Sequence, residues 1–112
     1  MTRCEFFTEG ERITGFSVSG HSGYAEAGAD IVCAAISALT QSTLNGLQNV
    51  LKAPVMFEID DQRAFIEAEL TPEASEEQIQ QAQLLLVTLQ EGLQAIQRGY
   101  PRNVRIIFKE RR

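Results

Sequence analysis

The sequence predicts an α+β domain with the element order ββαββαβ, in which a mostly antiparallel sheet packs against two long helices. Two segments carry apolar residues at the three- and four-residue spacing of a helix, and shorter segments rich in Phe, Ile and Val lie between turn residues. With 112 residues, 44% of them hydrophobic, the chain has the size and apolar content of one domain, 1–112.

Two strands are expected at the N-terminus, over residues 2–7 and 12–19, on either side of a turn at 9–11. Gly15 interrupts the alternation of the second strand, as glycine does at a β-bulge. The apolar residues expected in the core from this strand are Ile13, Phe16 and Val18.

The first helix is expected to begin at Asp30, whose carboxylate suits an N-cap, and to end before Pro54. Lys52 in its last turn complements the helix dipole. Its core-facing stripe is Val32, Ile36, Leu39, Thr43, Leu47 and Val50.

A hairpin follows, with strands at 55–59 and 63–70 joined by a turn at 60–62. Pro72 fits the first position of the second helix, which Gly99 and Pro101 end. A last strand is expected at 104–108. The stripe of the second helix is Ile79, Ala82, Leu86, Leu89, Leu93 and Ile96.

The formal net charge of −5 disfavours a nucleic-acid-binding surface, which needs clustered basic residues, and suits a basic partner. The basic C-terminal cluster, 109–112, is interpreted as a solvated end. The N-terminus does not resemble a signal peptide. Polar residues interrupt the longest uncharged stretch, which disfavours a membrane span. Two cysteines are too few for the disulfide framework of a small secreted domain. The chain is therefore expected to be cytoplasmic, with no membrane contact.

That uncharged stretch, 31–51, also bears on assembly. A surface helix normally carries charges on its outer face, and this one carries none while Ala34, Ala35 and Ala38 keep its first half thin. We expect a homodimer that covers this helix; the alternative is a central helix packed beneath the second one.

Cys33 and His21 are the residues best placed for chemistry. His21, the single histidine, lies in a glycine-rich segment, and Cys33 lies in the first turn expected of the next helix. Free N–H groups at a helix start stabilise a thiolate, and an imidazole nearby stabilises it further. Three glycines are expected to make the segment between them a flexible loop that substrate orders: Gly20, Gly23 and Gly28.

Structural interpretations stand beside these. Cys33 and Cys4 also fit as small core residues, and a loop histidine also fits as a surface side chain. Asp30 is expected to cap the helix and to orient His21, and Ser37, one turn after Cys33, to support the site or to permit close packing. No zinc-type ligand spacing appears, so no metal and no cofactor are expected.

The segment from Gly20 to Ser37 (GHSGYAEAGADIVCAAIS) resembles the signature of the ribosomal-processing cysteine protease family, Prp. A Gly-His pair is followed by a loop and then by Gly-x-Asp-Ile-Val-Cys-Ala-x-x-Ser. The signature positions matched here are Gly20, His21, Gly28, Asp30, Ile31, Val32, Cys33, Ala34 and Ser37.

The resemblance implies a homodimeric bacterial cysteine endopeptidase that removes an N-terminal extension from a large-subunit ribosomal protein. Cys33 would attack the scissile carbonyl, His21 would act as base and then acid, and N–H groups at the helix start would hold the oxyanion. A ribosome-associated assembly or binding factor without chemistry is the alternative. A thiol-redox role is disfavoured because no resolving cysteine lies nearby.

Overall fold

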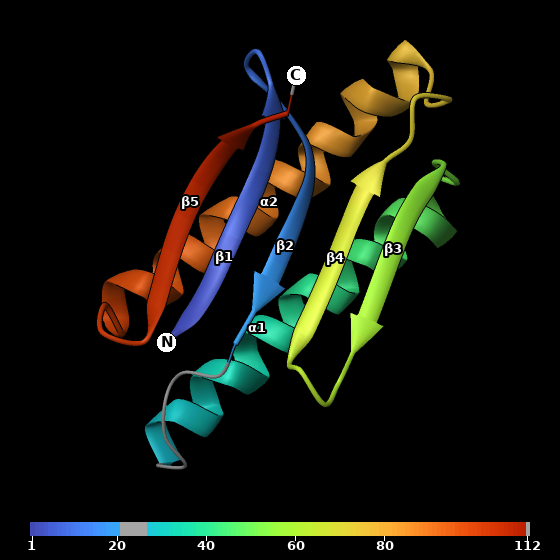
Figure 1. The fold of residues 1–112 in the computed structure, drawn as a ribbon. Helices are drawn as coiled ribbons and strands as arrows, with labels where there is room; N and C mark the ends of the chain where they lie inside the picture. The colour runs from blue at the N-terminus through green and yellow to red at the C-terminus, as the bar shows by residue number, and fades with distance from the viewer. Residues whose placement is uncertain (21–26, 112) are drawn as a thin grey trace.

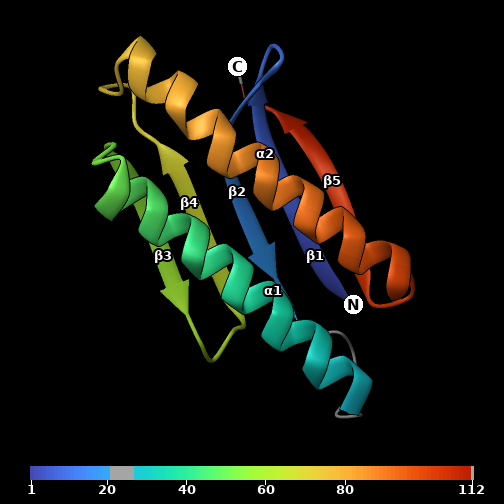
Figure 2. The same ribbon diagram turned by 180° about the vertical axis from the view of Figure 1, so that it is seen from behind.

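The computed structural model describes residues 1–20 and 27–111, and of residues 27–30 it describes the backbone alone. Five strands form one sheet in the order β3-β4-β2-β1-β5 (Figure 1). The helices α1, Ala27–Asn45, and α2, Glu76–Gly99, both cover one face of this sheet (Figure 2). The predicted order ββαββαβ is confirmed. The strands are β1 Thr2–Glu9, β2 Arg12–Ser19, β3 Val55–Asp60, β4 Phe65–Leu70 and β5 Val104–Glu110.

The sheet is mostly antiparallel, as predicted. The pairs β1–β2, β2–β4 and β3–β4 are antiparallel, and β5 alone runs parallel to its neighbour, β1. This parallel pair requires a crossover, which α2 supplies behind the sheet (Figure 1).

The core lies between the sheet and the two helices. Phe6, Phe16 and Ala68 are cross-strand partners on β1, β2 and β4, and all three are fully buried. The predicted stripe of α2 contributes to this core: Ala82, Leu86, Leu89 and Leu93 are buried, and Ile79 and Ile96 pack against them. Burial of this apolar surface is the main favourable term in folding.

The β-bulge predicted at Gly15 is present in β2, directly beside this residue. The register moves by one residue there, since Phe7 pairs with Gly15 whereas Thr8 pairs with Ile13, which leaves Thr14 as the extra residue of a bulge. A Cβ atom at Gly15 would overlap the carbonyl oxygen of Ala68 on β4. Glycine is therefore required here by the close approach of two backbones.

The first helix begins three residues earlier than predicted, at Ala27 rather than Asp30. Asp30 is therefore not the N-cap, and Gly28, predicted to lie in the loop, is helical. Alanine is the strongest helix former, so Ala27 and Ala29 favour extension of the helix across these positions.

The end of the first helix also differs from the prediction. A π-helical turn, Gly46–Val50, follows α1, and Leu51 N–H donates to the Gly46 carbonyl at 2.9 Å. A π-helical turn contains more residues than an α-helical turn, so it rotates the apolar stripe of the helix away from the core. Leu47 is therefore buried, whereas Val50 is 76% exposed. The predicted core position of Val50 is wrong. Lys52 lies beyond the last turn, contrary to the prediction, although its ammonium group donates to the Asn49 carbonyl.

Two predicted boundaries in the second half are corrected. Pro72 does not start α2, because Ser75 is the N-cap: it forms a capping box with Gln78 that satisfies backbone donors at the helix start. The strand expected from Arg63 begins at Phe65, because the Asp60 carboxylate accepts the N–H groups of Gln62 and Arg63 and holds them in the turn.

Residues 109–111 are exposed, as predicted for a solvated end, but Arg111 is also anchored to the sheet. Its guanidinium lies 4.0 Å from the centre of the Phe7 ring and donates to both carboxylate oxygens of Glu69 at 3.1 Å. Its backbone N–H donates to Thr8. The chain end therefore ties β5 across the open face of the sheet to β4.

The outer face of α1 is not covered by the other described residues of the chain. Ala34 and Ala38 are exposed, and Ile31 is 59% exposed. The alternative of a central helix packed beneath α2 is therefore wrong. Neither helix in the described part of the chain is long and apolar enough to cross a bilayer.

Candidate active site

Cys33 lies in the second turn of α1, because the helix begins at Ala27. The N–H groups without intrahelical partners belong to the first turn, and the helix dipole acts mainly there. The predicted first-turn position of Cys33 is therefore corrected, and with it the argument that the helix start stabilises its thiolate. Cys33 is half-buried and has an interacting partner in the structure.

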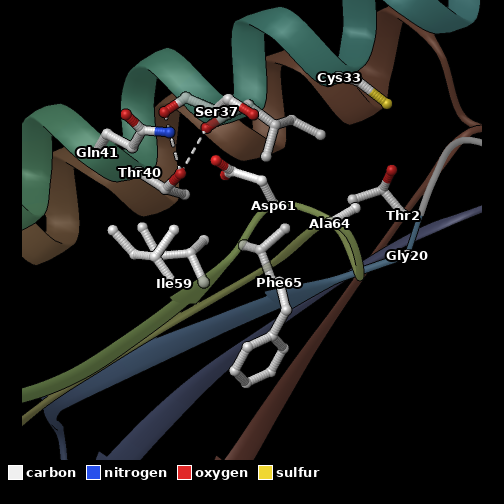
Figure 3. Close-up of a pocket in the computed structure, with 13 residues that line it drawn as sticks. Thr2, Gly20, Cys33, Ser37, Thr40, Gln41, Ile59, Asp61, Ala64 and Phe65 are labelled. Carbon is white, nitrogen blue, oxygen red and sulfur yellow. Dashed lines mark hydrogen bonds between the residues drawn. The ribbon is translucent and has the colours of Figure 1, made fainter.

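A groove of about 200 Å³ opens beside Cys33, between α1 and the β3–β4 hairpin. In Figure 3 the Cys33 sulfur stands at one end of this groove, near the first residues of β1 and the end of β2. Apolar side chains make up much of its lining: Val18, Ile36, Ile59 and Ile66. Such a groove suits an apolar segment of a peptide.

Ser37 lies one turn after Cys33 and lines the same groove, as their spacing predicts. Thr40, on the next turn, is fully buried and donates to the Ile36 carbonyl at 2.8 Å. This bond holds the Thr40 hydroxyl against the helix backbone, whereas Ser37 is an exposed residue that lines the groove (Figure 3).

Gly20 also lines the groove, at the end of β2. Its φ of +86° lies in the left-handed region that favours glycine, and a Cβ atom there would lie 3.0 Å from the Met1 carbonyl. The predicted site residues His21 and Gly23 lie outside the described residues. Asp30 and Gly28 are described by their backbone alone, in the first turn of α1.

Cys4 differs from Cys33 in burial. It is fully buried in the core, and desolvation raises the pKa of its thiol to about 12. A thiol that stays protonated at neutral pH is a poor nucleophile. The prediction that Cys4 is a core residue is confirmed.

Further polar residues of the groove were not identified from the sequence, and Asp61, Thr2 and Gln41 are among them. Asp61 comes from the β3–β4 turn and Thr2 from the start of β1. Asp61 had the appearance of an ordinary turn residue, and Thr2 of an ordinary strand residue, so no sequence signal connected them with Cys33.

Thr2 is unusual because it is only 2% exposed and its Oγ1 has no hydrogen-bond partner among the described residues. In Figure 3 its side chain points from the sheet toward the part of α1 that carries Cys33. A buried hydroxyl without a partner is destabilising by about 1–3 kcal/mol. Within the described part of the chain, no group of three His, Cys, Asp or Glu side chains is arranged to hold a metal ion.

Comparison with known proteins identifies relatives along most of the chain. The chain is 29% identical over 94 residues to the ribosomal processing cysteine protease Prp of Bacillus subtilis strain 168, covering 84% of each. It also resembles the crystal structure of the Prp protease of Staphylococcus aureus in complex with a substrate peptide, with a TM-score of 0.82 and 26% identity over 97% of this chain and all of that one.

A second structure of the S. aureus protease, in complex with a covalently linked product peptide, gives a TM-score of 0.81 at 26% identity, over 97% of this chain and all of that one. The sequence model of the family described as cysteine protease Prp matches residues 1–105. This match and the shared fold confirm the resemblance found in the sequence, and the chain belongs to the cysteine protease Prp family.

Proposed function

We propose that this chain is a bacterial cysteine endopeptidase that removes an N-terminal extension from a protein of the large ribosomal subunit. The observation that carries the proposal is the position of Cys33, half-buried at the end of a groove with an apolar lining. Two properties of the S. aureus relative support it: that protease was crystallised with a substrate peptide and with a covalently linked product peptide.

In this mechanism the Cys33 sulfur attacks the carbonyl carbon of the scissile peptide bond, and His21 accepts the thiol proton. His21 then donates that proton to the leaving amine as the C–N bond breaks, which leaves a thioester on Cys33. A water molecule hydrolyses the thioester, releases the new carboxylate and restores the thiol. Support for His21 comes from the chain: it is the single histidine, and it directly follows Gly20, which lines the groove.

The supporting residues take different roles. Ser37 is proposed to contact the bound peptide, since it lines the groove one turn from the nucleophile. Asp30 is proposed to orient His21 rather than to cap the helix, because α1 begins before it. The oxyanion donors expected at the helix start belong to residues 27–30, one turn before Cys33, so the N–H of Cys33 is not among them.

The test is mass spectrometry of the ribosomal precursor after incubation with the protein. We expect the wild type to remove one fixed N-terminal segment and the Cys33→Ala variant to leave the precursor intact. Cys4→Ala is the control, because it removes a thiol that lies in the core, and it should cleave at the same site. Cleavage by Cys33→Ala, or an intact precursor with the wild type, would contradict the proposal.

We further propose that the protein acts in the cytoplasm as a homodimer in which a second copy covers the exposed face of α1.

The alternative function is that of an assembly factor without catalytic activity. If Cys33→Ser replaced the wild type in living cells without loss of growth, this alternative would be the better description.

A further inference from the structure

We propose that Asp61 selects the substrate by pairing with a basic side chain, Lys or Arg, that lies two or three residues from the cleaved bond. This inference rests on the proposed endopeptidase function and adds a specificity residue to it. Among the described residues that line the groove, Asp61 is the single charged one. The described part of the groove therefore offers a peptide one negative charge beside apolar side chains.

The hairpin turn itself explains why Asp61 is available. Its neighbour Asp60 is occupied: one carboxylate oxygen accepts the N–H groups of Gln62 and Arg63, and the other accepts from the Arg63 side chain at 2.8 Å. Arg63 also binds Glu58 at 3.2 Å. Arg63, the basic residue of this turn, is therefore already paired with two other carboxylates.

The alternation of the hairpin separates these groups onto two faces. Side chains on a strand point alternately to opposite faces, so Asp60 and Glu58 share the face away from the helices. Arg63 lies on that face too, 5.0 Å from the centre of the Phe65 ring, and this ring points away from the groove in Figure 3. The Asp61 carboxylate instead points toward α1, near Ser37 and Thr40.

The position of Asp61 along the groove indicates which substrate residue it meets. Ser37 and Cys33 are one helical turn apart, about 6 Å along the axis. An extended peptide covers that distance in about two residues. A peptide with its scissile carbonyl at Cys33 therefore brings a residue two or three positions away beside Asp61. A cation there forms an ion-paired hydrogen bond with the Asp61 carboxylate, in which both partners are charged, whereas a neutral side chain lacks this attraction between opposite charges.

The experiment uses peptides of the ribosomal precursor that span the cut, with Lys, Gln or Glu placed in turn at each of the three positions on either side. For the wild type we expect kcat/KM to favour Lys over Gln about tenfold at one position two or three residues from the cut, and Glu to be the poorest there. Asp61→Asn should abolish this preference, and Asp61→Lys should reverse it in favour of Glu.

Glu58→Gln is the matched control, because it removes the same charge from the opposite face of the same hairpin and should keep the preference for Lys. Cleavage of all peptides without a charge preference would overturn this inference and leave the proposed function standing. An equal loss for every peptide in Asp61→Asn would also overturn it, since Asp61 would then bind the peptide backbone. If the wild type cleaved no peptide and not the precursor, the proposed function would fail, and this inference with it.

Discussion

At the scale of single residues, the two cysteines show how tertiary position decides reactivity. Cys33 borders a groove, whereas Cys4 is enclosed by the core. We expect iodoacetamide to label Cys33 much faster than Cys4 in the folded protein at neutral pH, because burial keeps the Cys4 thiol protonated and out of reach. Peptide mapping by mass spectrometry measures both rates. Equal rates under native conditions would contradict the assignment of Cys33 as nucleophile.

The raised pKa of Cys4 should also affect how the free energy of unfolding depends on pH. Its pKa is raised from 9.0 to about 12 in the folded protein, so between these values the unfolded chain binds fewer protons than the native one. The free energy of unfolding must therefore fall as pH rises through this window, by about 1.4 kcal/mol per pH unit for this group. Urea titrations from pH 8 to 11 should show a shallower decline for Cys4→Ala than for the wild type.

Thr2 gives a third prediction at this scale. Val has the shape of Thr without the hydroxyl, so Thr2→Val removes a buried oxygen for which residues 1–20 and 27–111 supply no hydrogen-bond partner. We expect the free energy of unfolding to rise by about 1 kcal/mol, measured by chemical denaturation. A decrease in stability would show that the hydroxyl has a partner in solution.

At the scale of secondary-structure elements, β2 and β4 meet so closely at Gly15 that a methyl group has no space. Gly15→Ala must displace the β4 backbone, and we expect a loss of about 3 kcal/mol in the free energy of unfolding. Gly99→Ala is the control, because nothing lies within 4 Å of a Cβ atom there, and it should change stability by less than about 0.5 kcal/mol. Similar losses in both variants would exclude the overlap as the cause.

The elements also show where local signals sufficed. The stripe of α2 predicted its buried face residue by residue, because each apolar position lies on one side of a regular helix. Helix starts were less predictable. Asp30 and Pro72 are residue types that favour a helix start, but α1 begins at Ala27 and α2 begins after the capping box at Ser75. The π turn at 46–50 reoriented Val50, and no residue type announces such a turn.

At the scale of the whole molecule, one face of α1 is uncharged, built largely of small residues and exposed in the described chain. Because Ala38 is exposed in the single chain, Ala38→Glu should leave the fold intact and separate the proposed dimer into monomers. Ala95→Glu makes the same chemical change on the exposed side of α2 and should leave the dimer unchanged. Sedimentation equilibrium measures both. A wild type that is monomeric at all micromolar concentrations would rule out the dimer.

The sequence by itself determined the element order, the buried stripe of α2 and the Cys33 signature, because all three are written in local spacing and residue type. Only the tertiary structure decided what surrounds Cys33. Asp61 and Thr2 come from a hairpin turn and from the first strand, far from Cys33 in the chain, and folding brings them to one groove. The physical reason is that contacts between distant segments depend on sheet order and helix placement, which local patterns do not encode.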